Sequence, residues 1–320
     1  MLGDLYLGLD IGGSNIRAAL TDSDTGLVGD IQRRPFKRLG NVEKEVEENI
    51  CSLIEKILIE NGSCRKAPKA VGISLAALFN RENGKIEYWP NNHVWNGFPL
   101  KEYLEEKYKT PVILEDDANS AAIGELHLGA ARGFSSFVYL TVSTGIGCGI
   151  ILNGKIYSGT HGWAGELGHI KVPNCQNICK CGASGCLQTV ASGPALLNRA
   201  ERLAREYHSP CADGLSRLED AVKYAVKGEQ WAVKVFREAG EYLADALTNL
   251  VMLLDIPLIV IGGGVSRAGD VFILPIIKAL NANLEPRKRR VEVRTALCGD
   301  DCGVIGASLL AVNQWEADGL

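Results

Sequence analysis

The chain has 320 residues, which is long for one compact domain and sufficient for two. Its net charge of −4 lacks the positive character of a general nucleic-acid binder, and 46% hydrophobic residues is ordinary for a globular protein. No basic cluster precedes the first apolar stretch, and Asp255, Pro257 and three glycines interrupt the longest apolar region, 250–265. We therefore expect a cytoplasmic protein without a signal peptide or a membrane span.

Short β-rich runs alternate along the chain with stretches of helical periodicity. In the first part we expect strands at 5–10, 16–21, 70–76 and 112–114, and helices at 42–60 and 118–131. In the second part we expect strands at 137–142, 148–152, 258–261 and 291–295, and helices over most of 193–254 and at 304–315. This alternation favours an α/β fold.

Three glycine turns each follow an apolar strand. Their candidate ligand-binding residues are Asp10, Gly12, Gly13, Ser14 and Asn15 in the first, Thr144 and Gly145 in the second, and Gly263 and Gly264 in the third. Glycines let the backbone approach a ligand, and successive N–H groups can hold an anion. One such turn could be a plain hairpin, but three favour a nucleotide clamp, in which Asp10 could hold a metal-bound water. None of them has the Walker or dinucleotide pattern, which disfavours a P-loop enzyme and a dehydrogenase.

Four of the ten cysteines lie within twelve residues of one another: Cys175, Cys179, Cys181 and Cys186. Without a secretory signal, such clustering favours metal ligands or free thiols over disulfides. Zinc prefers four tetrahedral nitrogen or sulfur ligands, and a loop without a core of its own can gain folding energy from the metal. His169 or Cys175 could complete a set with the other three cysteines.

An acidic run, Glu115, Asp116 and Asp117, follows a short apolar strand and opens a helix. The carboxyl ends of strands are where α/β folds bind ligands, so a catalytic carboxylate fits there. An acidic helix amino terminus, favourable to the helix dipole, explains the same run equally well.

The order of the three turns resembles the actin-like sugar-kinase fold. More narrowly, the run 166–169, followed by 179–182 and 185–187, resembles the signature of the ROK family of sugar kinases and sugar-responsive repressors. The resemblance covers about 8–311. It implies a two-lobed, ribonuclease H-like α/β fold with the active site in the cleft between the lobes and a zinc-stapled loop. We expect the lobes at 1–118, completed by the helix 304–320, and at 119–303.

The resemblance also implies the roles of individual residues. Asp117 matches the catalytic base, and ATP with Mg²⁺ is expected on the three glycine turns. The resemblance assigns structural Zn²⁺ to His169 and three of the cysteines, and Cys175 is not among these ligands. The implied metal ligands are His169, Cys179, Cys181 and Cys186, and the implied sugar-binding residues are Asn91, Asp116, Glu166, His169 and Gln188.

Some positions depart from the family pattern and put the substrate in doubt. Asp116 stands where many relatives have asparagine, Gln188 stands where most have glutamate, and 74–77 lacks a usual glycine. We expect phosphorylation of a hexose, at the 6-hydroxyl of glucose or a close relative. The alternatives are an amino sugar or N-acetylhexosamine kinase and a non-catalytic sugar sensor. A repressor is disfavoured because nine residues precede Asp10, so no DNA-binding domain is expected there. We expect a homodimer or higher homo-oligomer that binds neither nucleic acid nor membrane.

Overall fold

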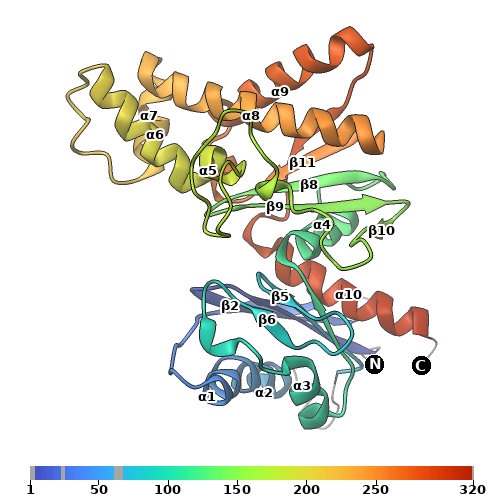
Figure 1. Cartoon of the computed structure of the whole chain (residues 1–320). Coiled ribbons are helices and arrows are strands. Elements are labelled where there is room, and N and C mark those ends of the chain that lie inside the picture. The colour runs from blue at the N-terminus through green and yellow to red at the C-terminus, as the bar shows by residue number, and fades with distance from the viewer. Residues whose placement is uncertain (1–3, 23–25, 61–67, 319–320) are drawn as a thin grey trace. The chain divides into compact units, whose positions relative to one another are not determined.

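The computed structural model describes residues 4–22, 26–60 and 68–318. Contacts divide them into two compact units (Figure 1). The first comprises the described residues up to 132, with 159–162 and those from 300 onward; the second comprises 133–158 and 163–299. The expected lobe boundary after residue 118 falls inside helix α4 (Asp117–Leu128). That helix packs against α10 (Cys302–Asp318), so it belongs wholly to the first unit.

The first unit is built on a five-stranded mixed sheet with the order β3-β2-β1-β4-β7. The strands are β1 (Leu5–Ile11), β2 (Asn15–Asp22), β3 (Gly26–Pro35), β4 (Val71–Leu75) and β7 (Val112–Glu115). The first three are antiparallel neighbours, whereas β1, β4 and β7 run parallel. The carboxyl ends of β1, β4 and β7 therefore share one edge of the sheet.

Helices cover both faces of this sheet, so β1 is buried on both sides and shows little polar alternation. Leu7 and Leu9 point into a core shared with α1 (Val42–Val46), α2 (Ser52–Glu60) and α3 (Leu100–Tyr108). On the opposite face α10 approaches closely: a Cβ at Gly72 would stand 1.8 Å from the carbonyl oxygen of Ala307. Only glycine leaves room for the helix at that point.

The second unit repeats the strand order of the first. Its sheet has the order β10-β9-β8-β11-β12, with antiparallel pairing among the first three and parallel pairing of β8, β11 and β12. The strands are β8 (Phe137–Val142), β9 (Ile146–Leu152), β10 (Lys155–Ile156), β11 (Leu258–Gly262) and β12 (Glu292–Thr295). An α/β fold with mixed sheets is thus confirmed.

The helices of the second unit pack over a large apolar core under β8 and β11. They are α5 (Gln188–Ala191), α6 (Gly193–Glu206), α7 (Leu218–Val226), α8 (Gln230–Leu254) and α9 (Asp270–Leu284). The long helices α8 and α9 lie side by side (Figure 1). Within the described ranges, no helix combines the length and the apolar character needed to cross a membrane.

Several elements differ from the sequence-based expectation. The helix expected at 42–60 is interrupted by a π-helical turn, η1 (Glu47–Cys51), between α1 and α2. The helical region expected over 193–254 is three separate helices. Strand β3, helices α3 and α9, and the small hairpin of β5 (Leu78–Phe79) and β6 (Ile86–Tyr88) were not expected. α9 carries an internal proline, Pro275, and few polar residues, so its periodicity is weak.

Candidate functional site

The first glycine turn connects β1 and β2 in the first unit. The N–H of Gly12 donates to the carbonyl of Asn15 at 2.9 Å and closes the turn. Asn91, from the loop after β6, packs directly on it: a Cβ at Gly13 would stand 2.9 Å from Cγ of Asn91. The turn predicted to bind phosphate and the asparagine predicted to bind sugar are therefore neighbours, and a side chain at residue 13 would separate them.

Asp10 stands near the end of β1, beside this turn. Its carboxylate accepts hydrogen bonds from Nη1 of Arg17 and from Oγ of Ser74, each at 2.9 Å. Burial raises the pKa of Asp10, and the bonds from Ser74 and Arg17 counter that effect. Carboxylate oxygens suit Mg²⁺ or one of its waters, so the residue fits the role expected of it.

Asp116 and Asp117 lie where β7 gives way to α4. Asp116 is the N-cap of α4, and its Oδ1 accepts a hydrogen bond from the N–H of Ala118 at 2.9 Å. Asp117 is the first residue of the helix. The helix-cap interpretation of the acidic run therefore describes Asp116. Asp117 is half-buried at the carboxyl end of a parallel strand.

An ion pair that was not predicted from the sequence lies directly before these two aspartates. The carboxylate of Glu115 is buried and accepts two hydrogen bonds from the guanidinium of Arg81, at 2.6 and 2.9 Å. Arg81 lies in the turn between β5 and β6, 34 residues away in the chain. No local pattern in the sequence signals such a pair.

The other two glycine turns meet within the second unit. Gly263 has a φ of +85°, and a Cβ there would stand 2.4 Å from the carbonyl oxygen of Val142, at the end of β8. The N–H of Gly193, at the start of α6, donates to the carbonyl of Ser143 at 2.8 Å. The turn containing Thr144 and Gly145 is thus held between the turn of Gly263 and Gly264 and the amino terminus of α6.

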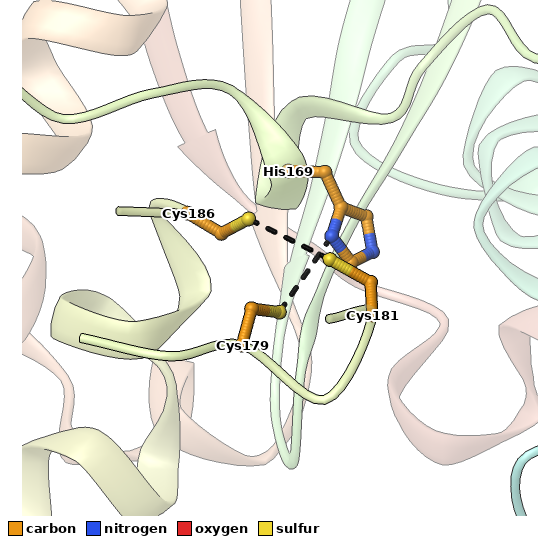
Figure 2. Close-up of side chains that lie close together, drawn as sticks. All are labelled: His169, Cys179, Cys181 and Cys186. Carbon is orange, nitrogen blue, oxygen red and sulfur yellow. Dashed lines mark hydrogen bonds between the residues drawn. The ribbon is translucent and has the colours of Figure 1, made fainter. Parts of the chain in front are cut away.

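The predicted metal ligands lie together in the second unit. One ligand atom from each of four side chains lies within 4.8 Å of the other three, and Figure 2 shows that the side chains converge. Two pairs of these atoms, Sγ of Cys179 with Nδ1 of His169 and the Sγ atoms of Cys181 and Cys186, are each 3.8 Å apart. Zn–S bonds of about 2.3 Å in a tetrahedron require sulfur atoms about 3.8 Å apart, so the donor set fits zinc.

The thiols of this cluster differ in acidity. Burial opposes ionisation of Cys179, but hydrogen bonds from the backbone of Cys181 and the side chain of Gln188 outweigh it and lower its pKa to about 6. Burial and the neighbouring Cys181 thiol raise the pKa of Cys186 to about 11. Cys175 takes no part: its Sγ faces Oγ1 of Thr189 at 3.6 Å.

Two predicted sugar-binding residues adjoin the cluster. Nε2 of His169 lies 3.7 Å from Oε2 of Glu166, while Nδ1 faces the cysteines. The imidazole can therefore join a metal to a carboxylate that is largely exposed. Gln188, the first residue of α5, contacts Cys179. Of the predicted sugar-binding residues, Asn91 and Asp116 belong to the first unit, and the other three belong to the second.

Comparison with known proteins identifies relatives over nearly the whole chain. The model of the ROK family matches residues 6–314. The glucokinase of Halalkalibacterium halodurans is 35% identical over 97% of this chain and 95% of its own length. The xylose repressor of Caldicellulosiruptor bescii is 26% identical over 86% of this chain but only 69% of its own length.

Solved structures show the same similarity. The ROK hexokinase of Thermus thermophilus is 31% identical and superimposes with a TM-score of 0.85, over 98% of this chain and 99% of that chain. A ROK family glucokinase from Streptomyces griseus, in complex with glucose and AMPPNP, is 30% identical with a TM-score of 0.78, over 97% and 99% of the two chains.

Proposed function

The chain belongs to the ROK family, and we propose that this ATP-dependent sugar kinase phosphorylates the 6-hydroxyl of glucose or a close hexose. The observation that carries the proposal is the position of Asp117, a half-buried carboxylate at the junction of β7 and α4. Phosphoryl transfer to a hydroxyl needs a base for the proton and cationic or N–H groups around the phosphates. Asp117 supplies the base.

The remaining predicted residues take supporting roles in this proposal. Hydroxyl groups of the sugar are held by Asn91, Asp116, Glu166, His169 and Gln188. The phosphates of ATP are held by backbone N–H groups of the three glycine turns, and Asp10 orients Mg²⁺ or one of its waters. The two units correspond to the two lobes of an actin-like fold.

We propose Zn²⁺ as a structural component of the second unit, bound by His169, Cys179, Cys181 and Cys186. When bound, the metal stabilises the loop and fixes the imidazole, and it takes no part in phosphoryl transfer. The spacing of the ligand atoms supports this assignment. We further propose a homodimer or higher homo-oligomer, which sedimentation would test.

Two alternatives keep the same scaffold. Asp116 adds a carboxylate next to that of Asp117. It could favour an amino sugar, because the ammonium group of such a sugar would form a charge-assisted hydrogen bond with this carboxylate. A non-catalytic sugar sensor would bind sugar without turnover. N-acetylated sugars rank last, since Ala76 and Ala77 leave less room than glycine would for a bulky substituent.

A coupled assay of ADP production tests the proposal. It should be run with glucose, mannose, glucosamine, N-acetylglucosamine and N-acetylmannosamine at saturating ATP. We expect the highest kcat/KM with glucose or another neutral hexose. A higher value with an N-acetylated sugar would refute the steric argument, and sugar binding without turnover on every sugar would favour the sensor.

A further inference from the structure

Arg81 is held by its neighbours on more than one side in the first unit. Its Nη1 and Nη2 donate to the two carboxylate oxygens of Glu115 at 2.9 and 2.6 Å. The guanidinium carbon also lies 5.5 Å from the centre of the Phe79 ring. On another side the chain passes close by: a Cβ at Gly162 would stand 2.3 Å from Nε of Arg81. The guanidinium is therefore fixed in both position and orientation.

The carboxylate that Arg81 holds organises the start of α4. Oε1 of Glu115 accepts hydrogen bonds from Nη2 of Arg81, from the backbone N–H of Asp116 at 2.9 Å and from Nδ2 of Asn119 at 3.0 Å. One oxygen atom thus joins the hairpin of β5 and β6 to the residue before Asp117 and to the first turn of α4. Only 7% of the Glu115 side chain is exposed, so protein donors and not bulk water satisfy this carboxylate.

We propose that Arg81 is a positioning residue for phosphoryl transfer: through Glu115 it holds the turn that carries Asp117. The inference rests on the proposed function, in which Asp117 is the base. Misplacing a catalytic group by about 1 Å can reduce a rate by as much as 100-fold. Glu115 without its partner would become a buried, unpaired carboxylate, and the turn beside it would relax toward solvent or another donor.

The test compares three variants with the wild-type protein under saturating glucose and ATP. Arg81→Gln removes the charge and the paired donors, and we expect kcat to fall roughly 10- to 100-fold, with little change in the KM for ATP. Arg81→Lys keeps the charge but lacks the planar fork, so we expect an intermediate loss. Arg237→Gln is the control, because it also removes an arginine from an ion pair, with Glu241 on the exposed face of α8 in the second unit. It should retain kcat.

Thermal unfolding of every variant separates positioning from folding. If Arg81→Gln is unfolded at the assay temperature, the double variant Arg81→Gln/Glu115→Gln removes the stranded carboxylate, and we expect it to fold with reduced kcat. A folded Arg81→Gln variant with wild-type kcat would overturn the inference, as would an equal loss in Arg237→Gln.

A crystal structure of Arg81→Gln gives a result independent of turnover. We expect the turn at 115–117 to be displaced. If Asp117 kept its wild-type position, the inference would be wrong whatever the activity. Absence of kinase activity in the wild-type protein would instead refute the proposed function, so the two failures are distinguishable.

Discussion

The side-chain amide of Gln188 donates a hydrogen bond from Nε2 to Sγ of Cys179, with the two atoms 3.1 Å apart. Oε1 of the same amide lies against the second glycine turn, where a Cβ at Gly145 would stand 3.0 Å from it. Gln188 therefore touches both the cysteine cluster and a turn predicted to bind phosphate. A glutamate at this position could only accept hydrogen bonds, so it could not donate to a thiolate.

The first prediction concerns that bond. Gln188→Glu should release zinc to a chelator about tenfold faster than the wild-type protein, because a carboxylate beside a thiolate repels it instead of stabilising it. The release is measured with a colorimetric zinc indicator. Gln176→Glu adds the same charge at an exposed site on the same loop and should leave the rate unchanged. Equal rates for the two variants would contradict the prediction.

The second prediction concerns the metal ligands. Metal analysis of freshly purified protein should give one zinc per chain. Cys181→Ser should lose the metal and become less stable to heat, whereas Cys175→Ser should keep both, because Sγ of Cys175 faces Thr189. Protein without zinc, or a Cys175 variant that loses it, would disprove the ligand assignment.

The third prediction concerns the base. Asp117→Asn retains size and hydrogen bonding but cannot accept the proton, so kcat should fall by about 10²- to 10⁴-fold while glucose binding persists. Calorimetry measures the binding, and the coupled assay measures the turnover. Asp220→Asn is the control, because Asp220 is also a first-turn acid of a helix, α7. Near-normal turnover in the Asp117 variant would exclude this residue as the base.

The fourth prediction concerns Glu45, a fully buried carboxylate in α1. It accepts from Nε1 of Trp95 at 2.7 Å, from Nδ2 of Asn92 at 2.6 Å, and from the N–H groups of Leu39 and Gly40 at 2.7 and 3.0 Å. Burial alone would raise the pKa of Glu45, but these four bonds outweigh it and lower the pKa. Its charged form therefore stabilises the first unit above about pH 5, and this contribution is lost as the pH falls through the lowered pKa.

Glu45→Gln should accordingly lower the local free energy of unfolding by about 2 kcal/mol at pH 7. The N–H₂ group of the new amide would face N–H donors and could not accept their hydrogen bonds. The difference from the wild-type protein should shrink at pH 3. Hydrogen exchange of 89–98 at both pH values measures it. Glu43→Gln, at an exposed position of the same helix, should have little effect. A cost independent of pH would argue against the ionised carboxylate.

The fifth prediction concerns the contact between the first glycine turn and Asn91. Gly13→Ala should raise the KM for glucose about tenfold, because the new methyl group must displace Asn91 from a site 2.9 Å away. The coupled assay at saturating ATP measures this. Gly214→Ala is the control, since its nearest neighbour would be 3.7 Å from the added Cβ. An unchanged KM would show that Asn91 does not contact the sugar.

Local patterns in the sequence predict some parts of this molecule and not others. The strands flanking the glycine turns are short apolar runs that end at glycine, so both the strands and the turns could be predicted. The cysteine cluster could be predicted as well, because Cys179, Cys181 and Cys186 lie close together in the sequence. Strand β3 contains few apolar residues, and its position at the sheet edge does not require them. The pair of Arg81 and Glu115 depends on a tertiary contact, which no local pattern encodes.

Helix α10 is the last helix in the chain order of the described residues, and its packing on the first sheet affects how the first unit folds during synthesis. Residues 133–299, which hold the second unit, leave the ribosome before α10 does, so this unit can fold while synthesis continues. The sheet of the first unit is synthesised much earlier, yet the face of β4 at Gly72 stays uncovered until Ala307 arrives. A nascent chain therefore exposes an apolar sheet face for most of its synthesis, and this face is where chaperones would be expected to bind.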